Sequence, residues 1–178
     1  MYPTWTSISA LLLVAASGVG FSRSAGQVLE SSNSPFPLVT TADLKQWQKL
    51  ARSHRIPRQL AEPGAITCSS RGSKPDSVAP VITVVRPDVA TAIHSPVDVE
   101  LRFSTAAGAH IDPNTLLVCY VGLITVDITD RLRGHSTVTE AGLEARGASL
   151  PSGNHRLRII LGDSVHRVGV KEVSFHVS

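Results

Sequence analysis

The chain has 178 residues, of which 42% are hydrophobic and 17% are charged, and its net charge is +3. This composition excludes a disordered or fibrous chain, and the length suits one domain of usual size with additional segments. The charge is unevenly placed. The segment from Asp43 to Asp76 carries seven basic and three acidic residues, whereas nine basic residues meet ten acidic ones after Val78. The basic character therefore belongs to an N-terminal segment.

Residues 1–24 are predicted to be a signal peptide. An apolar run over residues 8–21 has signal-peptide length, and small residues suited to cleavage follow it. The run is short for a membrane span. The alternative is an N-terminal anchor that is never cleaved, because residues 1–21 contain no basic residue. We expect an exported protein, located in the periplasm or outside the cell.

Residues 25–77 are expected to form an N-terminal segment with a short helix and a linker. Thr40 and Asp43 have the spacing of a capping box, and apolar residues then recur at helical spacing. This pattern predicts a basic amphipathic helix over residues 41–54, which ends before Pro57. Residues 62–80 are rich in Gly, Ser and Pro, which is typical of a linker or an extended strap.

The candidate partner-binding residues lie on this helix and directly after it: Lys45, Trp47, Lys49, Arg52, Arg55 and Arg58. Such a basic segment suits an acidic protein or another anionic surface. The alternative is a helix that packs Trp47 on the domain and leaves its basic face in water. Nucleic acid is not an expected partner, because Trp47 is the one aromatic residue among these basic residues and an exported protein would rarely meet nucleic acid.

The sequence contains two cysteines, Cys68 and Cys119. In an oxidising compartment such a pair can form a disulfide, which would stabilise the fold by about 4 kcal/mol on the chain-entropy model. The alternative is two unpaired thiols, because the distance between them in space does not follow from the sequence.

Residues 78–178 are predicted to form an antiparallel β-sandwich. Residues 97–104 alternate strictly between apolar and polar side chains, which is typical of a strand with one buried face. Six further short strands, separated by turn residues, are expected at residues 81–85, 116–121, 126–132, 142–148, 155–161 and 168–177. Seven short strands without an intervening helix indicate a sandwich.

Three runs in this region carry a resemblance: IDPNTL at residues 111–116, DITDRL at 127–132 and LPSGNHRL at 150–157. They resemble the turns and strands of immunoglobulin-like modules in exported bacterial proteins, over residues 79–178. The resemblance implies an immunoglobulin-like fold, and it identifies fold much better than function. Residues 162–166 depart from it, because they lack the Gly-Asn pair that follows the penultimate strand in many such repeats.

The stretch SGNHRLRIILGDSVH, at residues 152–166, contains short strings that also occur in ester hydrolases. A catalytic serine and histidine need direct hydrogen-bond contact and a third group that orients the imidazole. Ser164 and His166 are poorly placed for this contact, since they lie only two positions apart. Turn and strand patterns explain the whole stretch, so we expect no enzyme and no catalytic residue.

No residue is expected to bind a metal or a cofactor. The seven histidines form no close zinc-type pair, the aspartates lack calcium-loop spacing, and no Gly-rich phosphate loop occurs in the sequence. The pattern favours a non-catalytic interaction or structural module of the cell envelope, which binds another exported protein through a sheet edge or the basic helix.

The alternative function is a carbohydrate-binding or enzyme-accessory module, a role that sandwiches commonly serve. Sugar sites generally use exposed aromatic rings, and this chain has few aromatic residues. An exposed Trp47 would favour sugar binding, whereas a Trp47 packed on the sheet would disfavour it.

Overall fold

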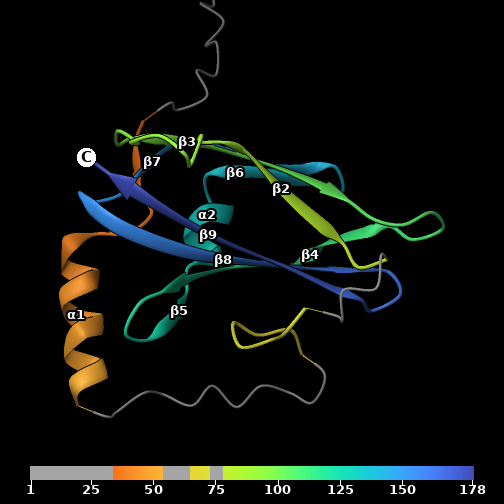
Figure 1. Cartoon of the computed structure of the whole chain (residues 1–178), viewed down its shortest axis with the longest axis horizontal. Helices are drawn as coiled ribbons and strands as arrows, with labels where there is room; N and C mark the ends of the chain where they lie inside the picture. The colour runs from red at the N-terminus through yellow and green to blue at the C-terminus, as the bar shows by residue number, and fades with distance from the viewer. Residues whose placement is uncertain (1–33, 54–64, 73–77) are drawn as a thin grey trace, which may run out of the picture. The chain divides into compact units, whose positions relative to one another are not determined.

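The computed structural model describes residues 34–53, 65–72 and 78–178. The predicted leader at residues 1–24 and the candidate residues Arg55 and Arg58 lie outside the described residues. The described elements in chain order, shown in Figure 1, are β1 (Phe36–Pro37), α1 (Thr41–Arg52), β2 (Val81–Arg86), β3 (Val97–Ser104), β4 (Ile111–Val121), β5 (Thr125–Asp127), α2 (Thr129–Arg133), β6 (Ser136–Thr139), β7 (Gly142–Ser149), β8 (Gly153–Asp163) and β9 (Val168–Val177).

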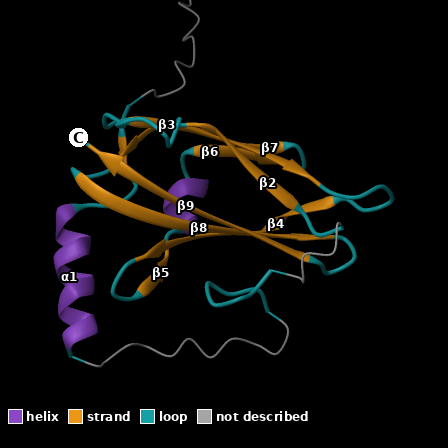
Figure 2. Ribbon diagram, viewed as in Figure 1, coloured by secondary structure: helices purple, strands orange, loops and turns teal. Residues whose placement is uncertain are grey.

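The strands form two sheets, which Figure 2 shows as two layers. One sheet has the order β2-β3-β7, and both β6 and β1 also pair with β7. The other sheet has the order β5-β4-β8-β9. The pairings among β2 to β9 are antiparallel. Immunoglobulin folds place strands A, B, E and D in one sheet and C, F and G in the other, and β2-β3-β7-β6 and β4-β8-β9 follow this order. The predicted immunoglobulin-like sandwich is therefore confirmed.

The alternating pattern of β3 is the clearest link between sequence and packing. This strand has the predicted bounds, and Val97, Leu101 and Phe103 are buried on its inner face. Side chains from both sheets meet these residues in a single hydrophobic core. The strands β8 and β9 extend over or slightly beyond the predicted ranges 155–161 and 168–177.

The predicted strand over residues 126–132 is confirmed at residues 126–127 and is wrong beyond them, because the chain leaves the sheet after β5. The carboxylate of Asp127 accepts hydrogen bonds from the backbone N–H and the hydroxyl of Thr129, which starts the short helix α2. Ile128 and Leu132 are both buried, and their spacing of four residues suits one face of a helical turn. The following strand β6 was not predicted, since its four residues have little apolar pattern.

The described part of the N-terminal segment belongs to the same core as the strands after residue 78. Phe36, Leu38 and Val39 are 2%, 1% and 2% exposed. β1 pairs with β7 in parallel, which places Phe36 beside Ala148. The Phe36 ring also stacks on His135, with ring centroids 4.1 Å apart. These contacts hold the chain against the sandwich directly before α1 begins.

The disulfide between Cys68 and Cys119 is present, which confirms the predicted pair. Its Cα atoms lie 5.9 Å apart, and it joins the segment at residues 65–72 to β4. Cys119 is fully buried. Next to it, Arg158 on β8 donates a hydrogen bond to the Ser70 carbonyl at 2.8 Å. The predicted linker is thus tied to the sandwich at this point.

Candidate functional site

The helix α1 begins with the capping box that the sequence predicts. The Asp43 N–H donates to the Thr40 hydroxyl at 3.1 Å, and the Thr40 N–H donates to the Asp43 carboxylate at 2.8 Å. Asp43 therefore takes the place of the usual glutamate, and the two residues satisfy each other's exposed backbone N–H groups. The helix ends at Arg52, close to the predicted end at residue 54.

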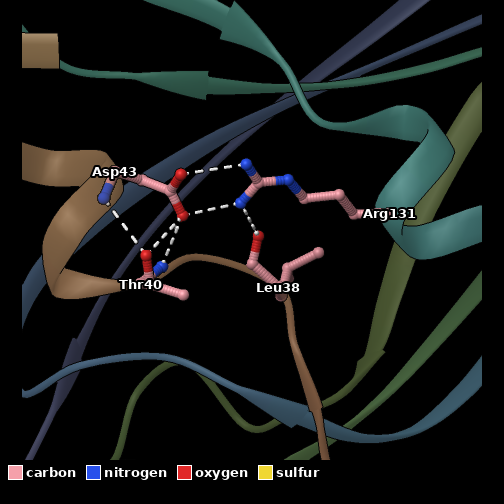
Figure 3. Close-up of polar contacts among 4 residues, drawn as sticks. All are labelled: Leu38, Thr40, Asp43 and Arg131. Atoms are coloured by element: carbon pink, nitrogen blue, oxygen red, sulfur yellow. Dashed lines mark hydrogen bonds and ion pairs between the residues drawn. The ribbon is translucent and has the colours of Figure 1, made fainter. Parts of the chain in front are cut away.

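Asp43 also fastens this helix to the sandwich. The Arg131 guanidinium on α2 contacts both carboxylate oxygens, at 2.7 and 2.9 Å, and donates to the Leu38 carbonyl at 3.3 Å (Figure 3). This two-point geometry is the strong form of an ion pair between arginine and a carboxylate. Hydrogen bonding from Arg131 holds the pKa of Asp43 well below its usual range, so Asp43 keeps its charge into more acidic solution than an ordinary aspartate.

The apolar face of α1 lies against the sandwich. Leu44 and Trp47 are half-buried and pack on the core. The Trp47 ring lies over Tyr120 of β4, with centroids 5.1 Å apart and planes tilted by 41°. No residue of α1 is fully buried. Trp47 thus packs on the sheet, as one of the two sequence interpretations expected, although the helix stays at the surface.

Below Trp47, a buried histidine continues the ring contacts into the sandwich. His155 is 4% exposed, and its Nδ1 lies 3.2 Å from the Tyr120 hydroxyl. Its Nε2 lies 2.7 Å from the Pro151 carbonyl. The carbonyl can only accept, so Nε2 carries the proton and Nδ1 of the neutral ring accepts from Tyr120. Burial lowers the pKa of His155 below its ordinary value.

The lowered pKa of His155 predicts that the fold loses stability under mild acid. As the pH falls through the ordinary histidine value of about 6.5, the unfolded chain takes up the proton first. The free energy of unfolding should therefore be lower at about pH 5 than at about pH 7. Urea unfolding at both pH values checks this, with His155→Gln as the control. The explanation fails if the variant loses as much stability on acidification as the natural chain.

The candidate binding residues on α1 lie on the face opposite Trp47. Lys45, Lys49 and Arg52 are exposed, and at 3.6 residues per turn they fall within about 60° of the helix circumference. The structure therefore brings three of the six candidates together in one stripe and places Trp47 on the opposite face. Asp43 is the one acidic residue of α1, and it is bound to Arg131. The charged residues on the outer face of the helix are therefore all basic.

The residues of the hydrolase-like string stabilise a turn. Asp163 is buried and pairs with Arg167 at 2.7 Å, and its carboxylate also accepts backbone N–H groups of Val165 and Arg167. The Ser164 hydroxyl accepts the N–H of His110 at 3.1 Å. His166 is exposed and has a φ of 62°, as in a tight turn. These contacts close the connection between β8 and β9.

Two kinds of feature are missing from the described residues. They contain no group of three or more His, Cys, Asp or Glu side chains that could hold a metal ion. In the same part of the chain, no helix has the length and apolar character needed to cross a membrane.

No family model matches this chain, and neither does any curated protein. One solved structure with a similar fold is that of murine CRIg. It is 10% identical, with a TM-score of 0.33, and the match covers 55% of this chain and 95% of that one. Because this likeness is so distant, the assignment of the fold rests on the strand order alone.

Proposed function

We propose that this chain is a non-catalytic interaction module of the cell envelope, which binds an acidic surface of another exported protein through the basic face of α1. The observation that carries the proposal is the charge arrangement of the helix. Lys45, Lys49 and Arg52 face solvent together, and the acidic Asp43 is neutralised by Arg131. A one-signed stripe of this kind attracts a partner of opposite charge.

The way in which α1 is held supports a protein partner over a lipid surface. A helix that lies in a membrane interface buries its apolar face among the lipid chains. In this chain Leu44 and Trp47 of that face pack on the sandwich instead. The bidentate contact of Asp43 with Arg131 and the capping box also fix the direction of the first turn. In this proposal the sandwich holds the helix in position, and the helix contacts the partner.

Carbohydrate binding has less support. The large apolar side chains that are exposed in the described residues are valines and a leucine, with no aromatic ring among them. Trp47 lies on Tyr120, and Phe36 stacks on His135. A flat sugar platform needs exposed rings.

Export is part of the proposal. It is supported by the apolar run at residues 8–21 and by the disulfide, since disulfides persist mainly in oxidising compartments.

The proposal predicts a salt-sensitive capture that depends on three side chains. The full chain is crosslinked in its native envelope at low and at high salt, beside a variant with Lys45→Gln, Lys49→Gln and Arg52→Gln. Glutamine forms helix well, so α1 is preserved while its charge is lost. We expect the natural chain to capture a partner at low salt. The amount of captured partner should be several-fold lower at high salt, because counterions screen exposed charges. The variant should capture little at either salt concentration.

The control is a second triple variant, Arg146→Gln, Arg156→Gln and Lys171→Gln. These residues are exposed on β7, β8 and β9, so this variant loses the same charge from the sandwich. It should capture as much as the natural chain, and the crosslinked peptides of the partner should be rich in Asp and Glu. Equal loss in both variants, or capture that ignores salt, would overturn the proposal.

A further inference from the structure

The strands β4 and β8 bury side chains on both faces of their sheet. Val118 and Ile159 lie opposite each other on these strands and belong to the core between the sheets. Successive side chains of a strand point to opposite faces, so Cys119 and Ile160 lie on the outer face. Both residues are fully buried, yet neither belongs to the core cluster. Another part of the chain must therefore cover this outer face.

The segment at residues 65–72, which we call the strap, provides this cover. The disulfide ties it to β4, and Figure 1 shows it in yellow on the side of the sheet away from β3. Ile66 lies against β8, since a Cβ on Gly162 would be 3.0 Å from the Ile66 Cδ1. At the other end, a Cβ on Gly72 would be 3.5 Å from the Cγ2 of Val170 on β9. The strap thus crosses three strands without forming a strand itself.

The polar contacts of Arg158 hold the strap only in part. Its guanidinium donates a hydrogen bond to the Ser70 carbonyl at 2.8 Å. The Nε of the same guanidinium is buried without a hydrogen-bond partner among the described residues, and the Glu172 carboxylate is 3.8 Å away. A buried N–H without an acceptor costs free energy, and water would satisfy it once the strap lifts. The closed strap therefore leaves one donor of Arg158 unpaired.

The noncovalent contacts alone do not offset the cost of ordering the strap. Fixing the backbone costs conformational entropy, and every residue of the strap adds to it. Against this cost stand the burial of Ile160, the partial burial of Ile66 and the hydrogen bond from Arg158. On ordinary magnitudes the entropy is the larger contribution. The disulfide lowers this cost, because it already holds Cys68 at Cys119. The closed position of the strap therefore depends on the covalent bond.

The two sulfur atoms of the bridge differ in access, because Cys119 is fully buried whereas Cys68 is half-buried. A disulfide is reduced when a thiolate attacks one of its sulfurs. A protein dithiol of the Cys-x-x-Cys kind would form a bond to the Cys68 Sγ while the bond between the bridge sulfurs breaks. Cys119 leaves as a thiolate and takes up a proton. The second thiol of the dithiol then attacks the mixed disulfide and releases Cys68 as a thiol, so two electrons pass to the chain and the dithiol becomes a disulfide.

We propose that the strap is a redox-controlled cover of the outer face of β4 and β8. Reduction of the bridge by a protein dithiol lifts the strap and exposes Ile160 and the Arg158 guanidinium, while the sandwich stays folded. The sandwich can remain folded because the core between the sheets does not contain the strap. This cover uses residues distinct from the basic face of α1, so it goes beyond the proposed function and does not depend on it.

The test measures how fast iodoacetamide alkylates Cys119 in a chain without the bridge. Cys68→Ser leaves Cys119 as the single thiol, because the chain has two cysteines. We expect Cys119 in the folded variant to react within about ten-fold of its rate in urea, since only the strap has to move. Circular dichroism shows whether the sandwich of the variant is folded, and a loss of its β-sheet signal would overturn the proposal.

The control is a single thiol on the core side of the same strand, made by Val118→Cys in a chain with Cys68→Ser and Cys119→Ser. Val118 is 2% exposed, so a thiol at this position reacts only when the sandwich unfolds. Its alkylation should be at least about a hundred-fold slower in the folded chain than in urea. Equal protection at positions 118 and 119 would show that the strap stays in place without the bridge. Equally rapid reaction at both positions would show that the whole sandwich opens, and either result would overturn the proposal.

The natural chain tests the exchange with a dithiol. Dithiothreitol, a small dithiol, should reduce the bridge in the absence of urea and leave the β-sheet signal of circular dichroism unchanged. A protein dithiol whose second cysteine is replaced by serine cannot complete the exchange, so it should remain bonded to Cys68. Mass mapping identifies the attached cysteine. A bridge that resists reduction until urea unfolds the sandwich would overturn the proposal, and an adduct at Cys119 would overturn the direction of attack.

Discussion

Replacing Cys68 and Cys119 with alanine should lower the free energy of unfolding by about 4 kcal/mol. The bridge joins residues 51 positions apart, so its loss returns considerable freedom to the unfolded chain. In the folded chain, the bridge fixes residues 65–72 against β4, where Arg158 binds the Ser70 carbonyl. Urea unfolding of the natural chain and the double variant measures the difference.

The control for this prediction is reduction of the natural chain. Reduction should cost about as much stability as the double substitution, and a reductant should leave the double variant unchanged. Unfolding midpoints that coincide for the oxidised natural chain and the double variant would show that the bridge adds nothing to stability.

Replacing Leu38 with alanine should cost about 3 kcal/mol, because it removes a fully buried side chain. Leu38 is 1% exposed and contributes to the lining of a small apolar cavity of about 40 Å³ between the sheets. Its backbone N–H bonds to the Ser149 carbonyl at 3.0 Å, so the chain cannot easily shift to fill the space. Chemical unfolding of the variant and the natural chain checks the value.

Leu44→Ala is the matched control for Leu38→Ala. Leu44 lies only six positions further on and is half-buried on α1, so its truncation should cost clearly less. Equal effects at the two positions would contradict the packing described for the N-terminal segment. A large effect at Leu38 alone would show that this segment is part of the sandwich core.

The sequence predicts the elements whose signal is local. The period-two pattern of residues 97–104 corresponds to β3, and the Thr40–Asp43 spacing corresponds to the start of α1. The predicted strand at residues 126–132 was wrong beyond residue 127 because Ile128 and Leu132 suit a helical turn as well as a strand. The carboxylate of Asp127 bonds to Thr129 two positions later, a local contact that suits a turn and that the strand prediction did not use.

The candidate site was predicted only in part, because its contacts span long stretches of the chain. Lys45, Lys49 and Arg52 were identifiable from their spacing, whereas Arg131 pairs with Asp43 across 88 positions. The contact of Trp47 with Tyr120, and of Tyr120 with His155, likewise depends on how the sheets pack. A periodic pattern in a single sequence does not show which residues far apart along the chain are in contact. The Cys68–Cys119 bridge was predictable because the chain has only two cysteines.

If the partner lies against the basic face of α1, site-specific photocrosslinking from that face should capture it. A photoreactive benzoylphenylalanine is placed at Gln48, which is exposed beside Lys49, or at Thr137 on the sandwich. Irradiation in the native envelope should give a covalent adduct from position 48 that fades as salt is raised, and none from position 137. Adducts from position 137 alone would contradict the claim and place recognition on the sandwich.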